Sequence, residues 1–118
     1  VEGAHIDKNS HNNNGEGMKE ALLSFNDAVK AALDYAKKDG HTLVVVTADH
    51  ETGGITLKNG EYVYTTGGHT GADVPLYVYG SDDFISENEE SIENTDIPKR
   101  IVSALEKDGF PCTVSVSE

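Results

Sequence analysis

Residues 42–47 constrain the fold of this chain more than any other segment. They read Thr-Leu-Val-Val-Val-Thr, a short apolar run without polar alternation. Such a run is typical of a strand covered on both faces in a parallel sheet. A helical pattern of apolar residues begins at Glu16 and stops at Gly40, directly before the run. A helix that feeds a strand of this kind predicts an α/β fold.

Turn signals divide the segments on either side of this unit. Residues 1–15 are rich in Gly, Asn and His, a composition that predicts a loop. Residues 55–57 and 62–66 are expected to form a small β-hairpin, because an Asn-Gly pair lies between them. The alternative for this stretch is a surface loop. A glycine-rich loop at 67–71 then leads into a predicted strand at 74–79.

The C-terminal part is predicted to form an acidic loop, a helix and a tail. Residues 81–96 hold seven acids and no base, which favours a solvated loop over a calcium site. A second helix is expected from Thr95, with Pro98 in its first turn and Gly109 as its terminator. Residues 112–116 are expected to form an edge strand.

Length and charge limit what the chain can do. Its 118 residues suffice for one domain, which we divide into 1–15, 16–80 and 81–118. The formal net charge of -12 and the lack of a basic stripe argue against nucleic acid and anionic membranes as partners. No apolar run approaches the ~18 residues of a membrane span. The start at Val1, without an initiator Met, leads us to expect a piece of a longer protein.

Carboxylates and histidines that could ligate a metal gather in three segments. They are Glu2, Asp7 and His11 in the first, Asp49 and His50 in the second, and His69 in the third. Asp oxygen and His nitrogen are the ligand set of a hydrolytic zinc ion, while Glu oxygen suits magnesium. Asp49 and His50 weigh most, because open α/β sheets bind ligands at the carboxyl ends of their strands. For the others a turn or capping role is the alternative.

Three segments carry a specific family resemblance. They are 1–11 (VEGAHIDKNSH), 46–54 (VTADHETGG) and 67–71 (GGHTG). In this order, and with a helix between the first two, they resemble successive signatures of the alkaline phosphatase family. The resemblance runs from residue 1 to about residue 80, and more loosely through the final helix. It implies that residues 1–118 are a C-terminal fragment of an alkaline-phosphatase-like domain, a sheet flanked by helices with a small β-hairpin insertion.

The resemblance implies a centre of two Zn²⁺ ions and one Mg²⁺ ion. Its implied ligands are Glu2 for magnesium, Asp7, His11 and His69 for one zinc, and Asp49 and His50 for the other. Residues 1–15 would then be a metal-ligand loop. Lys8 matches a position where some family members carry a lysine that contacts phosphate through water and where others differ. Two zinc ions about 4 Å apart can stabilise the attacking and leaving oxygens of a phosphoryl displacement.

The implied activity is hydrolysis of phosphate monoesters. The family's nucleophilic serine lies in an Asp-Ser-Ala segment before the first signature, and it cannot be mapped onto this chain. We therefore expect the isolated chain to be inactive and its partner to be the missing N-terminal part of the same enzyme. A homo-oligomer is the other expected assembly, because exposed strand edges invite pairing. The family also implies a periplasmic or secreted location.

Two other functions stay open. One is another metal-dependent phosphotransfer enzyme or phosphodiesterase of the same superfamily, which reuses Asp and His ligands on this fold. The other is a zinc-binding module without catalysis. Zinc binding without turnover, even with the complete chain supplied, would favour the module.

Overall fold

The structure is a computed structural model that describes residues 1–107. Its helices are α1 (Ala4–His11), α2 (Gly15–Asp39) and α3 (Asp96–Lys107). Its strands are β1 (Val44–Val46), β2 (Glu51–Thr52), β3 (Thr56–Lys58), β4 (Glu61–Val63), β5 (His69–Thr70) and β6 (Tyr77–Tyr79). None of the described helices is both long and apolar enough to cross a membrane. The predicted terminator Gly109 and the predicted strand at 112–116 lie outside the described residues.

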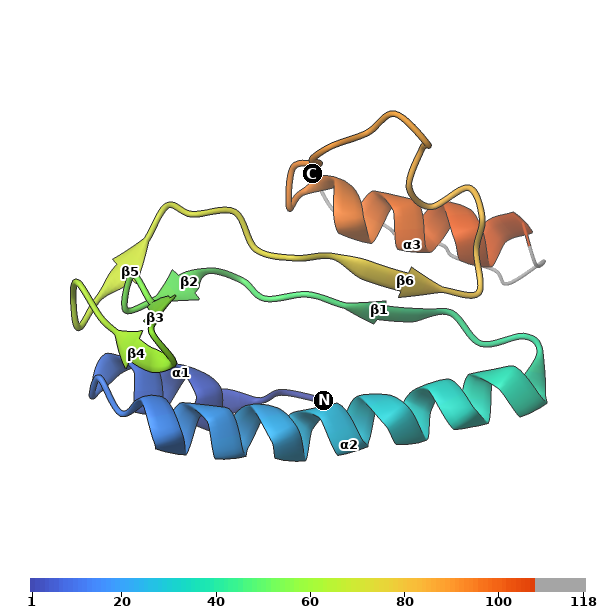
Figure 1. Cartoon of the computed structure of the whole chain (residues 1–118). Coiled ribbons are helices and arrows are strands. Elements are labelled where there is room, and N and C mark those ends of the chain that lie inside the picture. The colour runs from blue at the N-terminus through green and yellow to red at the C-terminus, as the bar shows by residue number, and fades with distance from the viewer. Residues whose placement is uncertain (108–118) are drawn as a thin grey trace, which may run out of the picture.

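The first predicted helix is confirmed as α2, which runs along one side of the molecule (Figure 1). Asn14 caps its N-terminus, because the side-chain oxygen of Asn14 accepts a hydrogen bond from the Gly17 N–H at 3.1 Å. The helix stops at Gly40, which has a φ of 75° and donates its N–H to the Ala36 carbonyl. The apolar spacing and the glycine stop were therefore sufficient to place this helix.

β1 lies between α2 and α3, with β6 beside it (Figure 1). The two strands pair antiparallel, with Val45 opposite Val78, and β1 is half-buried along its length. The prediction of a parallel strand covered on both faces is therefore wrong within residues 1–107, where every described pairing is antiparallel. The cause is the path of the chain, which turns back after β1 and returns along it through β6. The α/β architecture with flanking helices is confirmed.

The predicted β-hairpin is confirmed as β3 and β4. The two strands pair with Lys58 opposite Glu61, so that two residues form the turn. These are Asn59 with a φ of 52° and Gly60 with a φ of 85°. Positive φ at both central positions is the geometry for which Asn-Gly is preferred in tight hairpins.

The prediction of a loop for residues 1–15 is wrong for Ala4–His11, which form α1. α1 packs against α2, and Gly3 fits between the side chains of Ile6 and Phe25. The polar side chains that suggested turns instead bond to helix carbonyls, as the Ser10 hydroxyl does when it donates to the Ile6 carbonyl at 2.9 Å. Tertiary packing onto α2 therefore overrides the local preference, and the turn is confined to 12–14.

The second predicted helix is confirmed as α3, with Pro98 in its first turn. The acidic segment before it contains no helix or strand from 81 to 95. Residues 67–71, predicted as a loop, include β5, which pairs with β2.

An apolar groove separates α2 from β1 and β6. Its volume is about 670 Å³. The apolar residues that line it include Leu22, Phe25, Val29, Leu33, Val44, Val46, Tyr77 and Tyr79. Leu22 is 49% exposed and Tyr77 is 65% exposed. Among the described apolar side chains only Ala36 and Phe84 are fully buried, so the two layers are not tightly packed against each other.

Candidate metal centre

Two candidate ligands come from α1 and one from β5. Asp7 and His11 are four residues apart, which places them on one face of a helix, and His11 Nε2 lies 3.3 Å from Asp7 Oδ1. His69 of β5 is far from these two residues in the sequence but lies close to both of them in the structure. Its Nε2 lies 3.2 Å from His11 Nε2 and 4.0 Å from Asp7 Oδ1. Three ligand atoms from two elements therefore face one another.

The spacing of these three atoms fits a zinc ion. Tetrahedral zinc binds oxygen and nitrogen at about 2.0–2.1 Å, which places its ligand atoms about 3.3 Å apart. The separations of 3.3 Å between Asp7 and His11 and 3.2 Å between His11 and His69 match this value, and the 4.0 Å between Asp7 and His69 is longer. A carboxylate oxygen and imidazole nitrogens have lone pairs that repel one another unless a cation or a proton lies between them.

His11 is oriented for this role by the backbone. Its Nδ1 lies 2.7 Å from the Gly67 carbonyl oxygen, which can only accept a hydrogen bond. Nδ1 therefore carries a proton, and in the neutral imidazole the lone pair is on Nε2, the atom that faces Asp7 and His69. A backbone carbonyl on the far nitrogen is the usual support of a histidine that binds a metal.

His50 joins the same cluster from the segment before β2. Its ring stacks on that of His69, with centroids 3.5 Å apart and an interplanar angle of 20°. Asp7, His50 and His69 each offer a ligand atom within 4.8 Å of the other two. Asp7 and His69 are thus shared between two triads, one completed by His11 and the other by His50.

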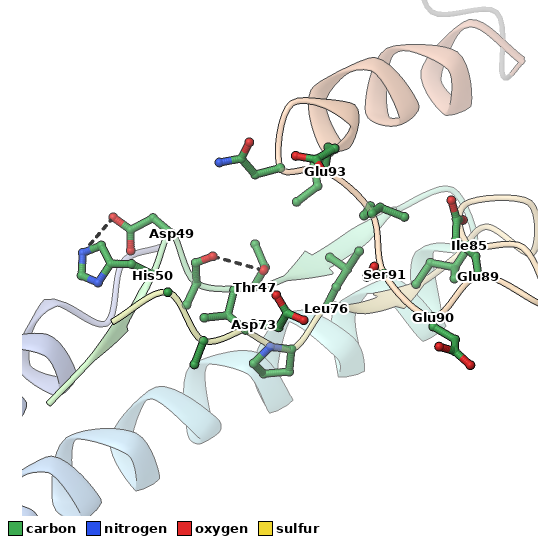
Figure 2. A pocket seen from close by; sticks show the side chains of 18 of the residues that line it. Thr47, Asp49, His50, Asp73, Leu76, Ile85, Glu89, Glu90, Ser91 and Glu93 are labelled. Atoms are coloured by element: carbon green, nitrogen blue, oxygen red, sulfur yellow. Dashed lines mark hydrogen bonds and ion pairs between the residues drawn. The ribbon is translucent and has the colours of Figure 1, made fainter. Parts of the chain in front are cut away.

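Asp49 lies at the edge of the cluster. Its Oδ2 is 3.5 Å from His50 Nε2, and its side chain is 90% exposed. Figure 2 shows the two side chains at one end of a pocket of about 630 Å³, which extends to Glu90 and Glu93. No lysine or arginine lines this pocket among the described residues. An anion such as phosphate therefore finds no basic side chain there.

Glu2 and Lys8 lie outside both triads. Glu2 lies before α1 in residues that form no helix or strand, where it lines a cavity of about 410 Å³ together with Asp7, Asp49 and His50. Lys8 is exposed on α1. The structure therefore gathers the predicted histidine ligands and Asp7 closely, while Glu2, Lys8 and the Asp49 carboxylate are less closely placed.

Two residues beside the ligands were not singled out from the sequence. Glu51 of β2 accepts hydrogen bonds from the N–H groups of Gly54 and Ile55, both at 3.1 Å, and from the Thr70 hydroxyl. The Thr70 hydrogen bond is the main cause that lowers the pKa of Glu51. Thr52, two residues after His50, contacts both His50 and Asp7. A polar residue two places after a candidate ligand in an extended segment shares its face, and this signal could have found Thr52.

The comparison with known families agrees with the three signature segments. The family model described as alkaline phosphatase matches residues 1–67, more than half of the chain. The chain belongs to the alkaline phosphatase family. The resemblance read from the signatures is thereby confirmed.

Individual members of the alkaline phosphatase family extend this similarity. Alkaline phosphatase 3 of Bacillus subtilis is 29% identical, over 90% of this chain and 39% of that protein. Alkaline phosphatase 4 of the same organism is 52% identical over 52% of this chain and 13% of that protein. A mutant of the alkaline phosphatase from the Antarctic bacterium TAB5, with Mg bound in its M3 site, is similar in structure. It has a TM-score of 0.74 and 36% identity, and the match covers 88% of this chain and 34% of that one.

The chain spans only part of these relatives. It covers 39% of the first Bacillus subtilis protein and 34% of the TAB5 structure. Most of each relative therefore lies outside the region that this chain matches.

Proposed function

We propose that this chain is the metal-binding C-terminal part of an alkaline phosphatase that hydrolyses phosphate monoesters. The observation that carries the proposal is the triangle of Asp7 Oδ1, His11 Nε2 and His69 Nε2, whose sides are 3.3, 3.2 and 4.0 Å. Family membership and the fold support the same assignment.

The proposed centre holds two Zn²⁺ ions and one Mg²⁺ ion. Asp7, His11 and His69 would hold one zinc, Asp49 and His50 the other, and Glu2 the magnesium. Bound metal ions would supply Lewis acidity toward a phosphoryl oxygen and lower the pKa of bound water. The stacking of His50 on His69 supports a short distance between the two zinc positions. Lys8 would contact phosphate through water from the exposed side of α1.

Electrostatics supports a role for metal ions in binding the substrate. The pocket beside Asp49 has no basic side chain among the described residues. Arg100, the only arginine of the sequence, donates to both carboxylate oxygens of Glu89, at 2.6 and 2.7 Å. A doubly charged phosphate would be repelled by Asp49, Glu90 and Glu93 unless cations offset their charge. Metal ions at the proposed ligands would supply that charge.

The nucleophile and the rest of the fold would come from outside these residues. We propose that the serine nucleophile belongs to an N-terminal part of the same enzyme. Most of the length of each relative lies outside the region that this chain matches, which leaves room for such a part. The apolar groove between α2 and β1 supports a large packing partner on this side. A homo-oligomer and a periplasmic or secreted location stay predictions from strand edges and from the family.

The test is hydrolysis of 4-nitrophenyl phosphate by the intact enzyme, meaning the longer protein that we propose contains this chain. His69→Ala and Asp49→Ala should each lower activity by orders of magnitude, because each removes a metal ligand. Asp82→Ala is the matched control, since Asp82 is exposed in the acidic segment, and it should retain activity. The isolated 118-residue chain with zinc and magnesium should show no turnover.

Three results would contradict the proposal. Equal losses for Asp82→Ala and His69→Ala would show that the site is wrongly assigned. Turnover by the isolated chain that His69→Ala abolishes would show that the chain carries its own nucleophile. Zinc binding by an intact enzyme without turnover would instead favour a zinc-binding module.

A further inference from the structure

We propose that Thr52 is a positioning residue that fixes the tautomer of His50 and the orientation of the Asp7 carboxylate. This inference rests on the proposed function, because it concerns the residues that would hold the metal ions. The Thr52 hydroxyl donates a hydrogen bond to Asp7 Oδ1 at 2.8 Å, and its oxygen lies 3.1 Å from His50 Nδ1. One hydroxyl therefore touches a proposed ligand of each zinc.

The number of available protons determines which atom donates and which accepts in these two hydrogen bonds. A hydroxyl has one proton to donate, and a carboxylate can only accept. The Thr52 proton is therefore directed to Asp7 Oδ1, and the contact with His50 becomes a hydrogen bond only if His50 Nδ1 carries the proton. The order is His50 Nδ1–H to Thr52 Oγ1, and Thr52 Oγ1–H to Asp7 Oδ1. The neutral imidazole of His50 then has its lone pair on Nε2, the nitrogen 3.5 Å from Asp49 Oδ2, where a zinc ion held by both residues would lie between the two lone pairs.

Burial makes the Thr52 contacts difficult to replace with water. Thr52 is 8% exposed, and it is one of only two buried polar residues among those described. β2 pairs with β5 so that Thr52 lies opposite His69, which fixes the hydroxyl beside the ligand cluster. An unpaired buried donor or acceptor is costly, so the hydroxyl has a strong preference for these partners.

The geometry of Thr52 parallels that of Gly67. The Gly67 carbonyl holds His11 in the Nδ1–H tautomer, and the Thr52 hydroxyl does the same for His50. Residues that orient metal ligands in this way change metal affinity by about 10- to 100-fold when they are altered. Thr52 differs in that it also binds Asp7, so its loss should affect both proposed zinc positions.

The experiment compares Thr52→Val, which removes the hydroxyl at nearly constant shape, with Thr52→Ser, which keeps it. Thr56→Val is the matched control, because Thr56 is an exposed threonine on the neighbouring strand β3. Zinc dissociation constants of the intact enzyme are measured by competition with a chromophoric chelator. Thr52→Val should weaken zinc binding by about 10- to 100-fold. Thr52→Ser should restore most of the affinity, and Thr56→Val should match the wild type.

A second readout separates positioning from a merely structural role. The ¹⁵N shifts of the metal-free enzyme, labelled at histidine and assigned with His50→Gln, report which ring nitrogen of His50 carries the proton. The wild type and Thr52→Ser should show the Nδ1–H tautomer, and Thr52→Val should show a mixture or the other tautomer. An Nε2–H tautomer in the wild type would overturn the inference, as would a Thr52→Val enzyme with wild-type zinc affinity. If circular dichroism shows that Thr52→Val does not fold, the tautomer of His50 in the wild type alone tests the inference.

Failure of the proposed function gives a different pattern. An intact enzyme that binds no zinc or hydrolyses no phosphate monoester contradicts the proposed function, whereas the tautomer of His50 in the metal-free protein still tests Thr52.

Discussion

Glu51 shows how a side chain outside the ligand set can organise the site. It lies between His50 and Thr52 in the sequence, and its carboxylate accepts from the N–H groups of Gly54 and Ile55 and from the Thr70 hydroxyl. These contacts join the turn after β2 to β5, the strand that carries His69. The turn at Gly53 and Gly54 and the position of His69 therefore both depend on the Glu51 carboxylate.

Glu51→Gln is expected to destabilise the protein by about 1–3 kcal/mol, because an NH₂ group would face donors and leave one of them unpaired. The contribution of the Glu51 carboxylate to the free energy of unfolding has a defined pH dependence. Since the pKa of Glu51 is lowered in the folded state, its stabilisation is present above the unfolded value of 4.5 and is lost as pH falls below it. Urea denaturation of the wild type, Glu51→Gln and the exposed control Glu61→Gln measures the effect. A Glu51→Gln protein as stable as Glu61→Gln would contradict it.

Among the helices and strands, the sequence predicted those that are defined by local periodicity or by turn residues. The spacing of apolar residues and the stop at Gly40 located α2, and the Asn59-Gly60 pair located the hairpin. α1 was missed because Asn, Ser and His favour turns locally, although the four-residue spacing of Asp7 and His11 was a helical signal. The antiparallel partner of β1 is about thirty residues away, and no local pattern specifies a pairing of that range.

The candidate site was predictable only in part for a similar reason. The signature segments indicated the ligand residues, and the structure brings Asp7, His11, His50 and His69 together. The contacts of Thr52 and Glu51 depend on how β2 meets α1 and β5, which is set by tertiary packing. Those residues could therefore be recognised only once the fold was known.

An ion pair between Arg100 and Glu89 anchors the acidic segment before α3. Arg100 of α3 donates to both carboxylate oxygens of Glu89 and also to the Phe84 carbonyl at 2.6 Å. The hydrogen bonds from Arg100 are the main cause that lowers the pKa of Glu89 from 4.5 to about 2. Phe84 is fully buried, so this pair anchors a segment that the composition alone describes as solvated.

Glu89→Gln is therefore expected to reduce stability at neutral pH and to have less effect in acid. Because the folded pKa is lowered, the ion pair contributes fully above about pH 4.5 and loses its contribution as pH falls toward 2. The difference between the melting temperatures of the wild type and Glu89→Gln should shrink across this interval. Glu87→Gln, an exposed change in the same segment, serves as control. A difference that is constant from pH 6 to about pH 2 would contradict the role of the ion pair.

For the whole molecule, the main feature is the apolar groove between α2 and the β1–β6 pair. Its lining includes Leu22 and Tyr77, which are 49% and 65% exposed. β1 has β6 on one edge and no other described strand on its second edge. Exposed apolar surface next to an open strand edge is typical of an interaction surface.

The double variant Leu22→Ser and Tyr77→Ser should reduce self-association of the isolated chain, because it removes apolar surface from the groove. Light scattering across a concentration series measures the mean mass of the chain. Leu57→Ser is the control, since Leu57 is 65% exposed on the hairpin outside the groove. A monomeric mass for the unmodified chain at every concentration would count against association through this surface.

The proposed zinc site requires Asp7, His11 and His69 to hold one zinc ion together. The most direct measurement is the zinc dissociation constant of the intact enzyme and of His11→Ala, with His5→Ala as a control on the same helix. We predict that His11→Ala weakens zinc binding by more than about 100-fold, because loss of a ligand exceeds the loss of an outer-shell partner. His5→Ala should bind zinc as the wild type does. Wild-type zinc affinity in His11→Ala would show that the triangle of Asp7, His11 and His69 is not a metal site.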